Sequence, residues 1–434
     1  MLLIKNITIA DPKSMTETTG DIFIKDGKIV NIVKLGGSED IGDIHASGEI
    51  TEIIDGTRLI AGPGLIDVHV HFRDPGLTYK EDISTGAKAA AAGGFTTVVM
   101  MANTKPPIDN IETLNYVLEK GRETDIHVES CAAVTVGMKS RELVDMRALK
   151  EAGAIGFTDD GVPILDAGLA RRAMEETAEL NVPISFHEEE PAYITNNGVN
   201  RGQASQHFEI GGSDRQAEIS MIARDVQLTL DTGATMNVQH ISTAEGVELV
   251  RQGKARGGSV WAEATPHHIA LTEEAVLVHG TLAKMNPPLR TKEDRYAIIQ
   301  GLVDGSIDLI ATDHAPHSIE EKAKSITEAP SGIIGLETSL ALCLTHLVKP
   351  GYMNHVQLLE KMSYNPARLY HLDNQRGHIS IGADADLVLY DPDAVWTVKD
   401  SFASKAVNTP FVGTELTGQV AYTICGGKVV YRRR

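Results

Sequence analysis

A short apolar segment near residue 70 carries two histidines and an arginine at alternate positions. The run reads Asp67-Val68-His69-Val70-His71-Phe72-Arg73-Asp74-Pro75-Gly76. Alternate side chains of a β-strand point to the same side, so His69, His71 and Arg73 are expected to lie together. Two imidazoles can hold one metal ion, and a guanidinium beside them can bind a carboxylate through two hydrogen bonds. The turn signal Asp74-Pro75-Gly76 follows at once. The segment predicts a metal site beside an anion site, where a strand leaves the core.

The composition is typical of a globular enzyme and excludes several other classes. The chain has 434 residues, a formal net charge of -19 and a pI near 5.3. This charge argues against a nucleic-acid or anionic-membrane surface, because those need a basic footprint. The three cysteines, Cys131, Cys343 and Cys425, are widely spaced, which predicts neither a disulfide framework nor a cysteine-based zinc site. We expect a reducing cytoplasm, with no export signal and no membrane span.

Residues 61–370 alternate strand-like with helix-like segments, which is typical of parallel strands joined by crossover helices. Helices are expected at 83–92, 164–180 and 215–231. Strands are expected at 65–71, 96–102, 127–134, 154–158, 183–187, 235–241, 260–265 and 308–312. This pattern predicts a (β/α)8 TIM-type barrel. An open doubly wound sheet is the alternative, which is disfavoured because no Gly-x-Gly-x-x-Gly turn follows an early strand.

Both ends of the chain favour short strands and tight turns instead. Strands are expected at 2–9, 21–24, 28–33, 52–60, 387–390, 421–425 and 428–431, with turns at pairs such as Asp26-Gly27 and Gly36-Gly37. Neither end alone has enough strands to bury a core. We therefore expect residues 1–60 and 371–434 to join into one small β-domain, and residues 61–370 to form the catalytic barrel.

Polar residues at the carboxyl ends of barrel strands meet at one mouth. Every expected strand end except the third carries such residues: His69, His71 and Arg73, Asn103, Asp159 and Asp160, His187, His240, His267 and His268, and Asp313 with His314 and His317. Histidine and carboxylate ligands without thiolates suit Zn2+, with Mn2+ or Co2+ as substitutes. There are more ligands than one tetrahedral ion needs, which favours two metals and a bridging carboxylate. Taken singly, His267, His268 and His314 fit a structural role equally well.

Five motifs together resemble the amidohydrolase superfamily. They are His69-Val70-His71-Phe72-Arg73-Asp74-Pro75-Gly76, Met101-Ala102-Asn103-Thr104, Phe157-Thr158-Asp159-Asp160-Gly161, Ala311-Thr312-Asp313-His314-Ala315-Pro316-His317 and Gly335-Leu336-Glu337-Thr338. Within the superfamily the chain is most similar to dihydroorotases of the type found as a separate bacterial chain. The resemblance covers nearly the whole length, and it implies the barrel and the composite β-domain expected above.

The resemblance also implies roles for particular residues. It implies that His69, His71 and Asp313 hold one zinc ion, that His187 and His240 hold a second, and that a carboxylate bridges them. Many relatives use a carboxylated lysine as the bridge, but residues 156–160 contain none, so the chain is similar to the branch that uses aspartate. Asp160 is the first choice for the bridging carboxylate and Asp159 is the second. The chain could bind two zinc ions or only one. Asp313 is the implied catalytic acid and base. The implied substrate-binding residues are Arg73, Asn103, Asn286, His317, Ser331 and Gly332. Residues 317–335 follow the last strand and are polar and glycine-containing, which predicts a mobile loop over the site and fits an ordinary solvated connection equally well.

The reaction implied by the resemblance is the reversible opening of a cyclic ureide, from dihydroorotate to N-carbamoyl-L-aspartate, in pyrimidine synthesis. It also implies a homodimer and, as in some relatives, association with aspartate transcarbamoylase. One alternative is another cyclic ureide hydrolase, an allantoinase or hydantoinase, which Arg73 disfavours because it suits a ring carboxylate. The other is a catalytically silent scaffold relative. The absent bridging lysine favours that alternative, whereas the complete set of ligands disfavours it.

Overall fold

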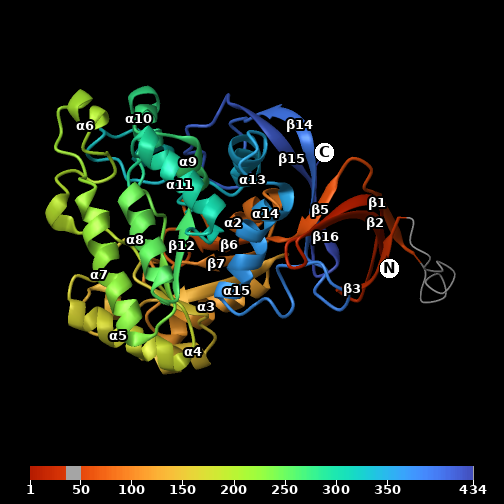
Figure 1. Ribbon diagram of the computed structural model, residues 1–434, viewed down its shortest axis with the longest axis horizontal. Coiled ribbons are helices and arrows are strands. Elements are labelled where there is room, and N and C mark those ends of the chain that lie inside the picture. The colour runs from red at the N-terminus through yellow and green to blue at the C-terminus, as the bar shows by residue number, and fades with distance from the viewer. Residues whose placement is uncertain (36–49, 434) are drawn as a thin grey trace.

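Eight parallel strands form a barrel in the larger part of the molecule (Figure 1). The structure is a computed structural model that describes residues 1–35 and 50–433. The barrel strands are β6 (Leu65–Val70), β7 (Phe95–Met100), β8 (His127–Ala132), β9 (Gly156–Thr158), β10 (Ile184–Phe186), β11 (Met236–Val238), β12 (Val260–Ala264) and β13 (Leu309–Ile310). A bridge between Val70 and His314 joins the last strand to the first. The predicted (β/α)8 barrel is confirmed.

Helices connect the strands and cover the outside of the barrel (Figure 1). They are α2 (Ile83–Ala92), α3 (Ile111–Arg122), α4 (Met146–Glu151), α5 (Ala167–Leu180), α6 (Gln203–His207), α7 (Gln216–Thr232), α8 (Ala244–Ala255), α9 (Pro266–Ala270), α10 (Glu274–His279), α11 (Lys292–Asp304), α12 (Ile319–Lys322), α13 (Ser339–Cys343), α14 (His355–Leu359) and α15 (Asn365–Leu369). Short 3-10 turns lie at η1 (Val136–Met138), η2 (Pro191–Tyr193) and η3 (Gly280–Ala283), and π-helical turns lie at η4 (Leu344–Val348) and η5 (Glu360–Tyr364). The helix expected at 83–92 is α2, and those expected from 164 and 215 are α5 and α7, which begin slightly later.

Local sequence explains where these helices begin and end. The Asp82 carboxylate accepts a hydrogen bond from Thr85 N at 2.8 Å, and the Thr85 hydroxyl accepts one from Asp82 N at 3.3 Å, which caps the start of α2. Helix α7 ends at Gly233, whose φ of 72° is in the left-handed region that glycine adopts without steric cost.

A second, mixed sheet contains strands from both ends of the chain. Its strands are β1 (Leu2–Asp11), β2 (Thr16–Lys25), β3 (Lys28–Lys34), β4 (Glu52–Asp55), β5 (Ile60–Pro63), β14 (Leu387–Thr397), β15 (Glu415–Cys425) and β16 (Lys428–Arg432). Strand β5 pairs with β1 on one side and with β14 on the other, so the two ends form one sheet. Ile4, Ile22, Leu387 and Ile424 share one buried cluster.

The sheet differs from expectation in detail. The single strand expected at 52–60 is two strands, β4 and β5. Strand β5 crosses the predicted boundary between residues 60 and 61, and the division of the chain into 1–60, 61–370 and 371–434 stays a prediction. The turn expected at Gly36-Gly37 lies outside the described residues.

The sheet packs against the barrel through hydrogen bonds as well as apolar contacts. Thr423 Oγ1 donates to Ala91 O at 2.6 Å, and Ser363 Oγ donates to Pro63 O at 3.3 Å. His127 Nε2 lies 3.0 Å from Asp386 Oδ2. Within residues 1–35 and 50–433, no helix is long and apolar enough to cross a membrane.

Candidate active site

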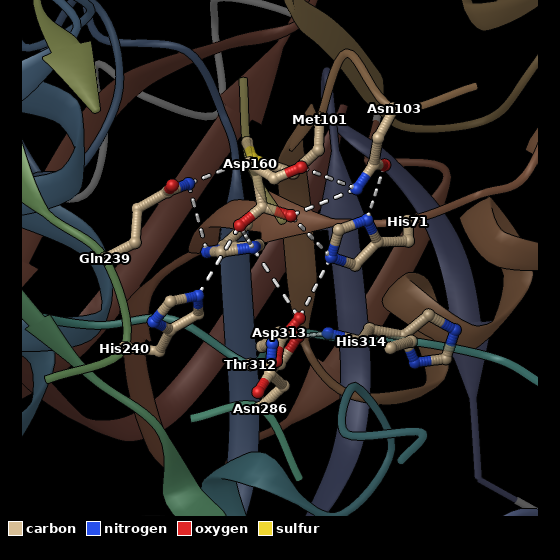
Figure 2. A network of polar contacts seen from close by, with 12 residues as sticks. His71, Met101, Asn103, Asp160, Gln239, His240, Asn286, Thr312, Asp313 and His314 are labelled. Atoms are coloured by element: carbon tan, nitrogen blue, oxygen red, sulfur yellow. Dashed lines mark hydrogen bonds and ion pairs between the residues drawn. The ribbon is translucent and has the colours of Figure 1, made fainter. Parts of the chain in front are cut away.

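Two groups of metal-type ligands lie at the carboxyl ends of the barrel strands, and both include Asp160. One group is His69, His71 and Asp160, and the other is Asp160, His187 and His240. Asp160 Oδ1 lies 3.4 Å from His69 Nε2, 3.5 Å from His240 Nε2 and 3.7 Å from His187 Nδ1, while its Oδ2 lies 3.5 Å from His71 Nε2. Figure 2 shows the carboxylate at the centre of this network. A carboxylate in this position can serve both groups at once.

Asp313 follows β13 and joins the first group. Its Oδ1 lies 2.9 Å from His71 Nε2 and 3.6 Å from His69 Nε2 (Figure 2). Burial by itself raises the pKa of Asp313, but the nearby His71, His69 and His240 outweigh burial and hold the pKa well below its usual range. The side chain is therefore a carboxylate at neutral pH.

The two groups fit a metal ion. His69 Nε2 and Asp160 Oδ1 are buried and have no hydrogen-bond partner among the described residues, whereas buried polar atoms in proteins almost always have one. Burial lowers the pKa of His69, but Asp160 and Glu263 outweigh burial and raise it well above the usual range. Burial raises the pKa of Asp160, but the surrounding histidines lower it well below the usual range. The carboxylates therefore attract positive charge to this point, either protons or a cation.

The outer ring nitrogens of three histidines have hydrogen-bond partners. His69 Nδ1 lies 2.5 Å from Glu263 Oε1, His71 Nδ1 lies 2.9 Å from Asn103 Oδ1, and His187 Nε2 lies 3.1 Å from Glu189 Oε2. Such partners fix the ring orientation and leave the other nitrogen free to bind a metal. Neither glutamate was predicted from the sequence. Glu263 had one signal, a charge inside the apolar segment 260–265, which is rarely buried without a partner.

Three residues of the site have left-handed backbone conformations. The φ angle is 60° at Arg73, 35° at His240 and 48° at Asp313. This region costs a non-glycine residue about 1–3 kcal/mol and occurs most often at functional sites. In each case the residue follows a barrel strand, so the turn directs its side chain into the mouth.

The remaining candidates lie outside the two groups. Asp159 Oδ1 accepts hydrogen bonds from Val134 N at 2.8 Å and Thr135 N at 3.1 Å, so its carboxylate holds the loop after β8. His314 Nε2 lies 3.5 Å from Glu81, and His268 Nδ1 lies 2.8 Å from Thr265 Oγ1. His267 is buried, which lowers its pKa to about 4.

A cavity of about 410 Å³ opens over the ligand groups. The expected substrate-binding residues line it: Arg73, Asn103, Asn286, His317, Ser331 and Gly332. Arg73 Nε donates to Pro316 O at 3.3 Å, and no described carboxylate forms an ion pair with Arg73. Asn286 Oδ1 is buried without a hydrogen-bond partner among the described residues. The cavity therefore offers a bound molecule a guanidinium without a direct ion-pair partner among the described residues, and a buried amide oxygen.

Residues 329–332 line one side of the cavity, and three cationic or imidazole side chains hold their carbonyl oxygens. Lys284 Nζ donates to Ala329 O at 2.7 Å, and Lys322 Nζ donates to Pro330 O at 2.9 Å and Gly332 O at 3.0 Å. His317 Nε2 lies 2.8 Å from Ser331 O and therefore carries the proton. We refer to residues 329–332 as the cavity segment. The predicted mobility of residues 317–335 stays a prediction.

The model of the amidohydrolase family matches residues 60–430. The chain belongs to the amidohydrolase family. A dihydroorotase from Clostridioides difficile (strain 630) is 54% identical over 431 residues, which cover 99% of this chain and 100% of the relative. A dihydroorotase from Streptococcus pneumoniae (serotype 4) is 48% identical over 433 residues, which cover both chains fully.

A solved member of similar architecture is the L-hydantoinase (dihydropyrimidinase) from Arthrobacter aurescens. It superposes with a TM-score of 0.87 at 27% sequence identity, over 99% of this chain and 96% of that one. Membership of the amidohydrolase family and the two ligand groups together indicate a hydrolase that binds a metal ion, typically zinc.

Proposed function

We propose that this chain is a zinc-dependent dihydroorotase, which interconverts dihydroorotate and N-carbamoyl-L-aspartate in pyrimidine biosynthesis. One observation carries the proposal: the guanidinium of Arg73, without a carboxylate partner among the described residues, shares a cavity with ligand groups joined by Asp160. Such a cavity suits a cyclic amide that carries a carboxylate. The two dihydroorotases that match this chain over its length support the same assignment.

The proposed metal complement is two zinc ions. His69, His71 and Asp313 would hold one ion, His187 and His240 the other, and Asp160 would bridge them, which the shared position of Asp160 supports. When bound, the metal supplies Lewis-acid polarisation of the ring carbonyl and a nucleophilic water with a lowered pKa. The protein contributes the ligands and the hydrogen-bond partners that fix the orientation of the histidine rings.

Asp313 is the proposed proton carrier. Its carboxylate is ionised at neutral pH, lies 3.6 Å from His69 Nε2, and lines the same cavity as His187 and His240. In hydrolysis it accepts the proton of the attacking water and gives it to the leaving ring nitrogen, and the reverse reaction follows the same path backwards.

Arg73 and Asn103 are proposed to bind the substrate carboxylate. Asn103 also contacts the ligands, because its Nδ2 lies 3.1 Å from Asp160 Oδ2 while its Oδ1 faces His71. Asn286, His317 and the backbone of Ser331 and Gly332 would contact the ring. His317 suits a neutral role because burial, together with Arg73 and Lys80, lowers its pKa to about 2.

The test follows the absorbance of dihydroorotate with zinc-loaded and chelator-treated protein, and metal per chain is measured on the same samples. We expect turnover that the chelator abolishes and zinc restores. Arg73→Met should lower kcat/KM roughly 10- to 150-fold, the value of one charge-assisted hydrogen bond of about 1.5–3 kcal/mol, with metal content unchanged. Arg73→Lys keeps the charge but loses the planar guanidinium, so its kcat/KM should lie between those of the wild type and Arg73→Met.

Two outcomes would replace the proposal. Equal kinetics for Arg73→Met, with turnover of hydantoins, would favour the hydantoinase alternative that the Arthrobacter aurescens structure represents. Metal binding without turnover of any cyclic ureide would favour a silent scaffold.

The assembly and compartment belong to the same proposal. We propose a homodimer, with association with aspartate transcarbamoylase as a further hypothesis by analogy with some relatives. The proposed compartment is the cytoplasm, which the three free, buried cysteines support.

A further inference from the structure

A second group of metal-type ligands lies at the opposite end of the barrel from the candidate active site. It consists of His127, Asp386 and Cys425, whose ligand atoms all lie within 4.8 Å of one another. His127 is the first residue of β8, Asp386 directly precedes β14, and Cys425 is the last residue of β15. The candidate active site lies at the carboxyl ends of the barrel strands, whereas this group lies at the amino end of β8, where the mixed sheet packs against the barrel. The two sites are therefore separate.

We propose that His127, Asp386 and Cys425 form a peripheral site for a thiophilic divalent cation, Zn2+ in the first place. Imidazole, carboxylate and thiolate are the ligands that zinc prefers, and the sulfur excludes Mg2+ and Ca2+ as natural occupants. The ion would connect one barrel strand to two strands of the sheet.

One pair of ligand atoms has nearly the spacing that a zinc ion requires. Bond lengths of about 2.0–2.3 Å place two ligand atoms of one zinc ion about 3.3–3.6 Å apart. His127 Nε2 and Asp386 Oδ2 are already 3.0 Å apart. Asp386 Oδ1 accepts a hydrogen bond from Gly426 N at 2.7 Å, which holds the carboxylate with Oδ2 toward the histidine. Cys425 Sγ contacts Thr96 O weakly at 3.7 Å and also interacts with the Asp386 side chain and the His127 backbone, so the thiol already lies beside the other two ligands.

Access and charge are also suitable. His127 and Cys425 line a cavity of about 660 Å³, from which a cation and a water for the fourth position can enter. Burial, reinforced by Asp386, raises the pKa of the Cys425 thiol, so the metal must displace its proton. The products are a bound thiolate and one released proton. The thiolate and the Asp386 carboxylate then neutralise the two charges of the ion, which makes the buried complex neutral.

The charges around the group do not oppose this occupant. Arg376 acts on Asp386 and Cys425, but its guanidinium is paired with Glu129 at 2.9 Å and Asp384 at 3.7 Å. Arg122 and Lys428 line the cavity together with Asp125 and Glu129, so cationic and anionic side chains are balanced there. The spacing of the cysteines along the chain predicted no zinc site because the ligands come from three distant segments. Only the packing of the sheet on the barrel brings them together.

Cobalt substitution tests this site separately from the active site. The two active-site groups contain only nitrogen and oxygen donors, so a thiolate-to-Co2+ charge-transfer band in the near ultraviolet reports a cysteine ligand. We expect the wild-type protein, loaded with Co2+, to show this band, and the Zn2+-loaded protein to hold one ion more per chain than Cys425→Val. Cys343→Val, a change at a buried cysteine outside the group, is the matched control and should keep both the band and the extra ion.

The readouts distinguish this proposal from the proposed function. Cys425→Val should turn over dihydroorotate at the wild-type rate with saturating zinc, and His127→Gln should lose the band while it keeps the cysteine. Absence of the band in the wild-type protein, or equal metal content in the wild type and Cys425→Val, overturns the proposal whatever the activity. If Cys425→Val does not fold, the wild-type spectrum and His127→Gln decide by themselves.

Discussion

Replacing Glu263 by glutamine removes one negative charge behind His69 and keeps the shape of the site. Glu263 Oε1 lies 2.5 Å from His69 Nδ1 and accepts a hydrogen bond from His240 N at 3.2 Å, and Oε2 accepts one from Asn237 Nδ2 at 3.1 Å. A glutamine amide would face the Asn237 amide, donor against donor. Asn237 Oδ1 has no hydrogen-bond partner among the described residues, so rotation of that side chain provides an acceptor, and we expect Glu263→Gln to fold.

The expected effect is on metal affinity. Loss of such a partner typically weakens metal binding about 10- to 100-fold, which corresponds to about 1.4–2.7 kcal/mol. Competition between the protein and a chelator of known zinc affinity measures this value, and excess zinc should restore most of the turnover. Glu189→Gln, which changes the partner of His187, is the matched variant and should weaken the other ion by a similar factor. Unchanged zinc affinity in a folded Glu263→Gln protein would refute this reasoning.

The remaining predictions concern single side chains. Asp160→Asn should lose at least one metal ion per chain. Asp159→Asn should keep the metal but lower the Tm, because the Asp159 carboxylate accepts hydrogen bonds from Val134 and Thr135. Metal analysis and thermal unfolding check both variants, and the reverse pattern would make Asp159 the bridge. Asp313→Ala should lower kcat roughly 10²- to 10⁴-fold in both directions, and near-normal rates would exclude its acid and base role. Lys322→Met should raise KM by loosening the cavity segment, while the exposed Lys324→Met should not. Burial lowers the pKa of Lys322 to about 7, well below the usual value of a lysine, so the unfolded chain keeps this proton at pH values where the folded chain releases it. The difference in free energy of unfolding between the wild type and Lys322→Met should therefore increase, in favour of the wild type, from about pH 7 towards pH 10. Urea unfolding at several pH values measures this difference, and a difference that does not change with pH would contradict the prediction.

Much of the barrel, and the gathering of histidines and aspartates at its mouth, could be predicted because the relevant signals are local. Alternation places His69 and His71 on one side of their strand, and the turn after them marks the mouth of a barrel. The run of strand-like and helix-like segments predicted β6 to β13 in their correct order. Residues of both chain ends were expected in one sheet because neither end could bury a core alone, and β5 pairs with β14 accordingly.

Other parts of the site depend on contacts between distant segments. Asp159 and Asp160 are neighbours in a motif that favours both, and only the path of the chain after β9 directs one to the histidines and the other to Thr135. Glu263 supports His69 across a sequence separation of 194 residues, which no local pattern reveals.

The sequence by itself determined which chemical groups are present and at which strand ends they lie, because side-chain alternation and turn signals are properties of a few consecutive residues. Tertiary structure alone decided which groups meet: Asp160 among four histidines, Lys322 against residues 330 and 332, and Cys425 beside His127 and Asp386. The physical reason is that a ligand set or a hydrogen bond requires atoms within a few ångströms, and the distances between segments arise only when the barrel closes and the sheet packs against it.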